Sequence, residues 1–190
     1  MPVSHPRAVH QVLGALHPGD AVGNEALVIR RHLRAAGHSS DIFAGWTDPR
    51  LDDEARPLRE FEAADGPATV CLYHFSPGSP AGRAALAAAG RLVLVYHNVT
   101  PSRFFAGWSD GAARLAARAK GELGELAPRT ALALAKSTFS LGDLEAAGFP
   151  RVGRLPYVHD AGRPGPASAV SRRTSVWMTC CAPSPCCSGA

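Results

Sequence analysis

Polar side chains with chemical capacity follow nearly every apolar run of this sequence. They are His17, Asp20, His74, Ser76, His97, Asn98, Ser137 and His159. Histidine exchanges protons and binds hydroxyl groups near neutral pH, whereas hydroxyl and amide side chains bind polar ligands without changing charge. The set is typical of a site that holds a polar ligand, although loops after strands are polar in many folds.

His97 is the candidate catalytic residue. It follows the apolar run at 92–96 directly and precedes Asn98 and Pro101. A histidine in this place can hydrogen-bond a ligand hydroxyl or stabilise charge near a reacting centre. The other interpretation is a structural hydrogen-bond partner, and the residues by themselves leave both open.

The segment 18–25 joins a predicted strand to a predicted helix and contains Gly19 and Gly23. Glycine lets the backbone approach a ligand closely, and a helix start offers free N–H groups to an anion. We therefore take Gly19, Asp20, Gly23 and Asn24 as candidate phosphate-binding residues, with a tight turn without ligand as the alternative. The dinucleotide fingerprint is absent, and Asp20 stands where a phosphate-binding loop needs lysine.

His74, Ser76, Asn98 and Ser137 are the candidate substrate-binding residues. Each follows a predicted strand, so each belongs to a connecting segment. No G-x-S-x-G elbow surrounds Ser76, and hydrolase chemistry is therefore not predicted.

Apolar runs alternate with helical patterns along the chain. Predicted strands cover 9–16, 41–44, 69–73, 92–96, 131–135 and 152–155, and predicted helices cover 24–36, 80–89, 102–126 and 139–147. We expect 46–66 to be loop with a short helix. This alternation predicts an α/β fold, a Rossmann-like parallel sheet with helices on both faces, over residues 1–160. Ligands of such sheets bind at the carboxyl ends of the strands.

Composition narrows the function classes. The 190 residues are 46% hydrophobic and 19% charged, with a formal net charge of +4. Lysine and arginine are scattered, so a nucleic-acid partner is not predicted. A run of about 18 apolar residues and a secretory signal are both absent. We expect a cytoplasmic protein, for which peripheral contact with the inner membrane face is compatible with the mildly basic charge.

Several segments carry a family resemblance. They are Val9-His10-Gln11-Val12-Leu13, the segment 18–27, Tyr73-His74-Phe75-Ser76, the segment 96–101, Phe104-Phe105-Ala106-Gly107, Ser137, the segment 144–149 and Leu155-Pro156. In this order, over about residues 8 to 160, the chain resembles bacterial glycosyltransferases of family four.

The resemblance implies the N-terminal domain of a GT-B fold, in which two Rossmann-like domains face a cleft. Family members transfer a sugar from a nucleotide donor with retention and without an obligatory metal, so the nucleotide sugar is a co-substrate and no cofactor is expected. The turn from Gly19 to Gly23 would approach the donor phosphates, and His97 would lie near the donor sugar. This domain mainly holds the acceptor, here an unknown glycan or lipid-linked molecule.

Residues 161–190 differ in character from the rest. A Gly- and Pro-rich linker precedes an aperiodic tail with four cysteines, whose adjacent pairs fit neither a zinc site nor the disulfides of a cytosolic enzyme. In a shifted reading frame, Trp177-Met178 and Met178-Thr179 both encode aspartate, and Cys180-Cys181 encodes leucine. Our hypothesis is a frame-shifted tail where a donor domain would begin, which would leave this chain inactive or nearly so.

Two rival interpretations stay open at this point. The first is a non-catalytic Rossmann-like module that binds an acceptor or a partner. The second is a different Rossmann-like enzyme, such as an epimerase or a dehydrogenase, against which the missing dinucleotide fingerprint counts.

Overall fold

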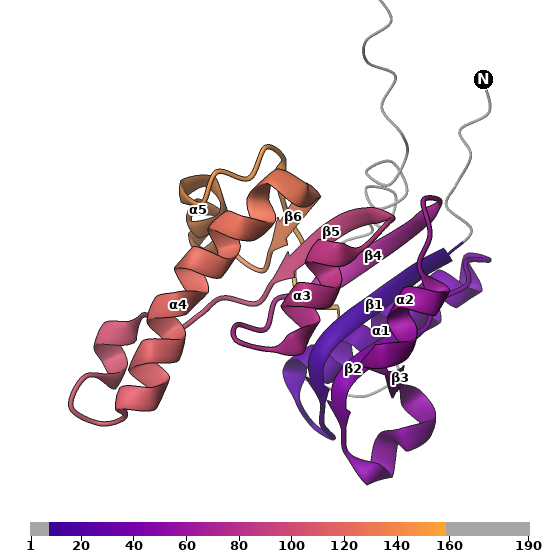
Figure 1. The fold of residues 1–190 in the computed structure, drawn as a ribbon, viewed down its shortest axis with the longest axis horizontal. Coiled ribbons are helices and arrows are strands. Elements are labelled where there is room, and N and C mark those ends of the chain that lie inside the picture. The colour runs from indigo at the N-terminus through magenta and orange to yellow at the C-terminus, as the bar shows by residue number, and fades with distance from the viewer. Residues whose placement is uncertain (1–7, 159–190) are drawn as a thin grey trace, which may run out of the picture.

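A computed structural model describes residues 8–158, so the predicted tail at 161–190 and His159 lie outside the described residues. Within this range, seven parallel strands form one sheet in the order β3-β2-β1-β4-β5-β6-β7 (Figure 1). The strands are β1 (Ala8–Leu16), β2 (Ile42–Thr47), β3 (Arg56–Pro57), β4 (Thr69–His74), β5 (Arg91–Tyr96), β6 (Thr130–Ala135) and β7 (Val152–Arg154).

Helices cover both faces of the sheet (Figure 1). The α-helices are α1 (Ala21–Ala35), α2 (Phe61–Ala64), α3 (Pro80–Ala87), α4 (Asp110–Leu126) and α5 (Thr138–Ala146). Four 3-10 helices connect them: η1 (Pro49–Glu54), η2 (Leu58–Glu60), η3 (Ser102–Phe105) and η4 (Ala127–Arg129). The predicted α/β fold with a Rossmann-like parallel sheet is confirmed.

Two predicted helices differ from the structure by more than two residues. Helix α1 begins at Ala21 instead of near 24, because the Asp20 side chain accepts a hydrogen bond from the Gly23 N–H and caps it there. The predicted helix at 102–126 is divided into η3 and α4. Gly107 has a φ of 75° and turns the chain, and Ser109 then caps α4 by accepting from the Ala112 N–H.

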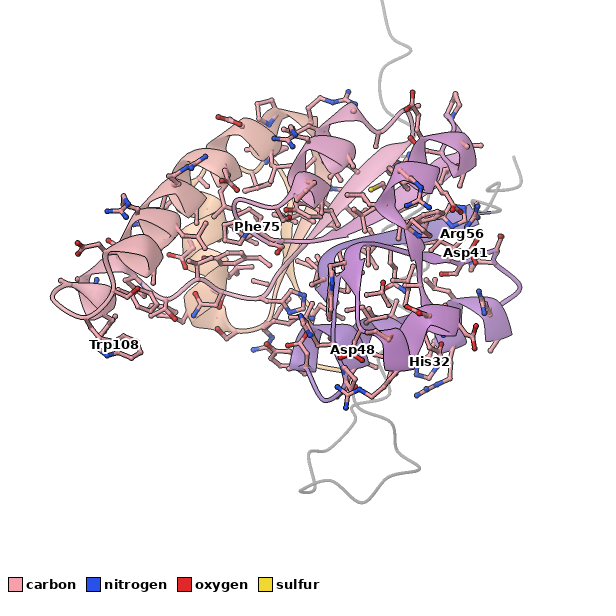
Figure 2. All side chains as sticks on the ribbon, turned by 60° about the horizontal axis from the view of Figure 1, so that its bottom comes forward. His32, Asp41, Asp48, Arg56, Phe75 and Trp108 are labelled. Carbon is pink, nitrogen blue, oxygen red and sulfur yellow. The ribbon has the colours of Figure 1, made fainter. Side chains whose placement is uncertain are left out.

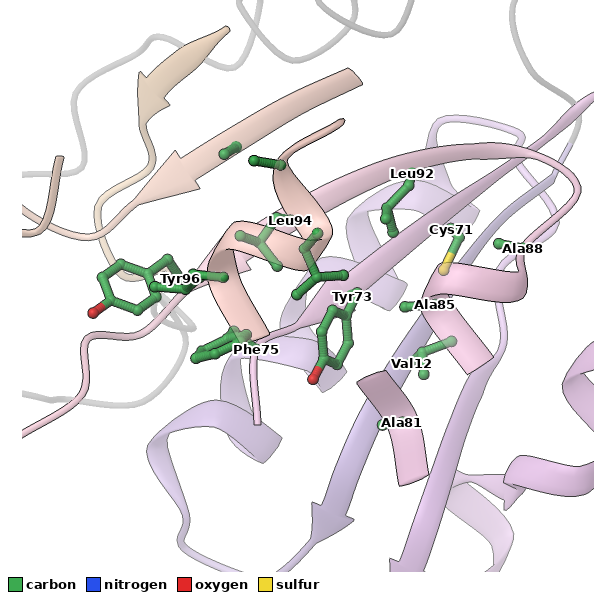
Figure 3. Close-up of a cluster of buried hydrophobic side chains, with 14 of the residues drawn as sticks. Val12, Cys71, Tyr73, Phe75, Ala81, Ala85, Ala88, Leu92, Leu94 and Tyr96 are labelled. Carbon is green, nitrogen blue, oxygen red and sulfur yellow. The ribbon is translucent and has the colours of Figure 1, made fainter. Parts of the chain in front are cut away.

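The face covered by α2 to α5 holds the larger apolar core. Alternate residues of each strand point to it, such as Cys71 and Tyr73 of β4 and Leu94 and Tyr96 of β5. Figure 3 shows Tyr73 and Tyr96 in this core on either side of Phe75, whose ring centroid lies 5.8 Å from that of Tyr96. Burying such rings and aliphatic side chains is the main favourable contribution to folding.

The opposite face packs against α1. Leu13 of β1 meets Ala26 of α1, and Val70 and Leu72 of β4 lie with Ile29 in a neighbouring cluster. The edge of the sheet beyond β1 is fixed by charges: Asp41 pairs with both Arg34 and Arg56 at its surface. Figure 2 shows Arg56 and Asp41 side by side there.

The order in which strands are added to the sheet changes side between β1 and β4. The chain runs from β1 outward through β2 and β3 and then returns to place β4 on the other side of β1. In open parallel sheets, ligands bind in the crevice at the carboxyl ends of the strands at such a switch point. The turns after β1 and β4 meet at this point. Within residues 8–158, none of the helices has the length and hydrophobicity that crossing a bilayer requires.

Candidate functional site at the carboxyl edge of the sheet

A row of buried polar side chains closes the α1 face of the sheet at its carboxyl edge. We call it the polar row, and it consists of Gln11, Glu25, His74, His97 and Lys136. Strand alternation explains the face, since His97 and Lys136 come two residues after the buried Val95 and Leu134. Four of the five residues come from β1, β4 and the first positions after β5 and β6, and α1 supplies the fifth.

Three members of the polar row form a hydrogen-bonded chain. The Gln11 Nε2 donates to the carbonyl of Ala26 over 2.9 Å, and its Oε1 lies 2.9 Å from Nε2 of His74. The Nδ1 of His74 lies 2.9 Å from Nε2 of His97, and the two rings are stacked with their centroids 5.2 Å apart. The chain therefore connects the backbone of α1 to the residue after β5.

Glu25 and Lys136 form a buried ion pair beside this chain. Lys136 Nζ lies 2.5 Å from Glu25 Oε2, and the side chains are 5% and 1% exposed. Glu25 Oε1 accepts a hydrogen bond of 3.0 Å from the Val158 N–H, and Lys136 Nζ lies 5.0 Å from the centre of the Tyr157 ring. The segment after β7 thus passes over the polar row and is anchored to it.

Burial sets the protonation of both histidines. Desolvation lowers the pKa of His97 to about 3, with the positive charge of Lys136 as a second cause. The pKa of His74 also lies well below its ordinary value, because the ring is buried and because His97 and Lys136 lie near it. Burial lowers the pKa of Lys136, an effect that Glu25 partly opposes. The histidines are therefore neutral imidazoles at physiological pH.

A metal ion is a poor occupant of this cluster. Glu25, His74 and His97 do present ligand atoms that lie within 4.8 Å of one another. However, the ammonium of Lys136 already lies against the carboxylate oxygen that a cation would need. Both ring nitrogens of His74 are also engaged, one by Gln11 and one by His97. A cation here would face an uncompensated lysine charge.

The candidate phosphate turn has a structural reason for most of its residues. Gly19 has a φ of 78°, which favours glycine. A Cβ on Gly23 would lie 2.9 Å from Leu16 Cδ1, so the start of α1 packs too tightly there for a side chain. Asp20 caps α1, and its backbone carbonyl accepts from the Asn24 N–H. The carboxylate of Asp20 already supplies the negative charge that this helix end favours.

The other predicted residues lie at the ends of β4, β5 and β6. Ser76 is half-buried, and its turn approaches β1 closely, because a Cβ on Gly14 would lie 2.3 Å from Ser76 Oγ. Asn98 is exposed with a φ of 73°. Ser137 is exposed and caps α5 by accepting from the Ser140 N–H over 3.1 Å. The structure brings these residues and His97 to one edge of the sheet, while His74 is enclosed below them at 1% exposure.

Sequence reasoning missed Gln11, Glu25, Lys136 and the aromatic residues Trp46 and Tyr157. Lys136 carried a signal, since it directly follows a predicted strand. Glu25 carried none, because an acid in the first turn of a helix is ordinary. Trp46 is the last residue but one of β2 and is 49% exposed, and its ring centroid lies 4.5 Å from that of His17. Trp46 thus offers a flat aromatic surface at the same edge.

An open hollow lies on the other face of the sheet. It is an open groove of about 1020 Å³ between the end of β2, η2 and α2 on one side and α3 on the other. Its lining includes Trp46, Thr47, Phe61, Asp65 and Pro80. The groove approaches the carboxyl edge at Trp46, Thr47 and Pro80, and no residue of the polar row lines it.

Fold and site together define an α/β Rossmann-like domain whose carboxyl edge carries a buried polar row under an exposed rim of serine and asparagine. No protein-family model matches the chain, and no curated protein matches it.

Proposed function

We propose that residues 8–158 form the acceptor-side domain of a retaining glycosyltransferase that takes its sugar from a nucleotide donor. One observation carries this proposal. The turns that contain Gly19, Ser76, His97 and Ser137 gather at a single edge of a parallel sheet, and the first two follow β1 and β4, which flank the switch point. These are the turns on which the resemblance to family-four glycosyltransferases rests.

The proposed roles follow from exposure. Ser76, Asn98 and Ser137 lie at the rim, where a hydroxyl or amide can bind the hydroxyl groups of a glycan or lipid-linked acceptor. Trp46 presents an aromatic face at the same edge of the sheet, near the end of β2. His97 lies one layer deeper, below the exposed ring of Tyr157, at a ring-centroid distance of 6.1 Å. A donor sugar would contact His97 once Tyr157 moves aside.

The donor phosphates need more than this domain offers. The turn with Gly19 and Gly23 approaches them in our proposal, but the Asp20 carboxylate at the start of α1 opposes a second anion there. Stabilisation of the leaving phosphate is the dominant catalytic contribution in such transfers. The proposal therefore includes a second domain that supplies positive charge, and it expects little transfer from residues 8–158 alone.

The test begins with the coding DNA across codons 160–180. A single-base shift is expected to open a reading frame for a donor domain. The protein translated through that frame is then assayed for sugar transfer and nucleotide release, with uridine, guanosine and adenosine diphosphate sugars as donors. Absence of such a frame, or a two-domain product that neither transfers nor hydrolyses any of these donors, would contradict the proposal.

A matched pair of histidine variants sharpens the assay. His97→Gln is expected to lower transfer by about 10²-fold, because it alters a group next to the reacting sugar. His32→Gln changes an exposed histidine on α1 and is expected to leave transfer unchanged. Acceptor binding without transfer would favour the rival interpretation, a non-catalytic binding module.

A further inference from the structure

The orientation of the Gln11 amide is fixed by the backbone. A carbonyl oxygen can only accept, so the Gln11 atom that lies 2.9 Å from the Ala26 carbonyl must be the NH₂ group. The opposite atom, Oε1, has no hydrogen and can only accept. Its neighbour at 2.9 Å is Nε2 of His74, which must therefore carry a proton.

The hydrogen bonds of His74 in turn determine which ring nitrogen of His97 carries a proton. A neutral imidazole has one N–H and one bare nitrogen, so a proton on Nε2 of His74 leaves Nδ1 as an acceptor. That acceptor lies 2.9 Å from Nε2 of His97. Nε2 of His97 must then donate, and its Nδ1 keeps the free lone pair.

We propose that Gln11 and His74 are positioning residues that hold His97 as the Nε2–H tautomer, with the Nδ1 lone pair turned toward Glu25 and Lys136. The tautomer rests on these hydrogen bonds together with the neutral state of both buried rings. Its use in catalysis rests on the proposed function, where a bare Nδ1 accepts a hydrogen bond from a sugar hydroxyl.

The Nε2–H tautomer of His97 is the opposite of the one usually found in a histidine beside a buried carboxylate. Such a histidine commonly donates Nδ1–H to the carboxylate, which orients the ring. Here His97 Nδ1 lies 3.8 Å from Glu25 Oε2, which is too long for a hydrogen bond, and among the described residues neither atom has a hydrogen-bond partner. Two acceptors that face each other need a donor between them.

Lys136 is the resident donor at that place. Its ammonium has three N–H groups, lies against Glu25, and is itself without a well-aligned hydrogen bond among the described residues. An ammonium that turns between Glu25 and His97 satisfies both acceptors. A ligand hydroxyl that reaches His97 Nδ1 then takes the place of the Lys136 ammonium as its hydrogen-bond donor. This exchange requires no proton transfer.

The test is the ¹⁵N spectrum of the histidine rings in the full chain, recorded with long-range proton correlations that separate protonated from bare nitrogens. His97 is assigned by the signals lost in His97→Gln. The expected pattern is a protonated Nε2 and a bare Nδ1 at neutral pH. The opposite pattern, with the proton on Nδ1, would overturn the proposal whatever the transfer assay shows.

Two substitutions at Gln11 separate positioning from general damage to the fold. Gln11→Leu removes the acceptor for His74, so His74 and then His97 can exchange tautomers. The Nδ1–H population of His97 should rise at least about tenfold, because a buried N–H without a partner is costly. Gln11→Glu loses the amide donor to Ala26 but keeps an acceptor for His74, and the native tautomer should persist. Equal tautomer ratios in the native chain and Gln11→Leu would contradict the role of Gln11, and should Gln11→Leu not fold, the native chain and Gln11→Glu decide.

Discussion

The two faces of the sheet have different contents near the carboxyl edge. On the face of α2 to α5, β5 ends with the buried Tyr96 and β6 with Ala135, both in the apolar core. On the α1 face the next positions along the same strands are His97 and Lys136, beside Glu25. The same strands thus supply an apolar core on one face and a charged, hydrogen-bonded cluster on the other.

The difference separates residues that serve stability from residues that need a functional explanation. Apolar packing contributes favourably wherever it occurs, whereas a buried ion pair rarely gains more than its desolvation costs. The core around Leu94 therefore needs no function to explain it. The polar row does, and its place at the switch point is where a Rossmann-like sheet binds ligands.

Removing one partner of the Glu25–Lys136 ion pair should have the largest effect on the free energy of unfolding. Glu25→Leu leaves Lys136 charged and buried, and should lower the free energy of unfolding by about 3–5 kcal/mol. The double variant Glu25→Leu with Lys136→Met removes both charges and should recover most of this loss. Urea unfolding of the three proteins measures it. A double variant as unstable as the single one would show that the pair itself stabilises the fold.

The apolar face should respond to truncation by a comparable amount but without any rescue. Leu94 is fully buried, so Leu94→Ala leaves a cavity and should lower the free energy of unfolding by about 2–5 kcal/mol. The same urea titration measures it. A loss below about 1 kcal/mol would mean that the core around β5 rearranges to fill the space.

Acid should act on the polar row before it acts on the apolar core. The unfolded chain protonates His97 near pH 6.5, whereas the folded chain does so only near a pKa of about 3. The unfolded state therefore binds more protons between these values. Stability from this residue is complete above pH 6.5 and falls by about 1.4 kcal/mol per pH unit as the pH drops toward 3.

Unfolding measured from pH 7 to pH 4 tests this prediction. His97→Gln should reduce the slope, and the part that remains includes His74, whose pKa is also depressed by burial. An unchanged slope in His97→Gln would indicate that the His97 ring is accessible to protons in the folded state.

A substitution far from both faces of the sheet should have the smallest effect on the free energy of unfolding. Trp108 is 82% exposed, just before α4, and Figure 2 shows it at the far end of the molecule from Asp41. Trp108→Ser should change the free energy of unfolding by less than about 0.5 kcal/mol. A larger loss in the same titration would reveal packing against this residue in solution.

The fold was largely predictable because its signals are local. Apolar runs such as 92–96 and the helical patterns between them defined a parallel sheet, and β5 and β6 were placed within a residue or two. The predicted loop at 46–66 contains the end of β2 and the two-residue strand β3. The larger helix errors came from single residues at caps and turns. Asp20 starts α1 earlier than the apolar spacing indicated, and Gly107 with Ser109 interrupts a pattern that continues in the sequence.

The candidate site was predictable only in outline. Strand ends placed His97 and Ser137 at one edge, since parallel strands share their carboxyl ends. The partners of His97 could not be found in this way. Glu25 of α1 lies beside it, and Gln11 of β1 is connected to it through His74; such long-range contacts leave no pattern in a single sequence.

In the proposed function, the polar row serves ligand chemistry and not stability. The most direct measurement is the transfer rate of the proposed two-domain protein that carries Glu25→Leu and Lys136→Met together, compared with the same protein without these substitutions. The account predicts a protein that unfolds at a similar urea concentration and transfers sugar about 10²-fold more slowly. Native transfer in the folded double variant would contradict it.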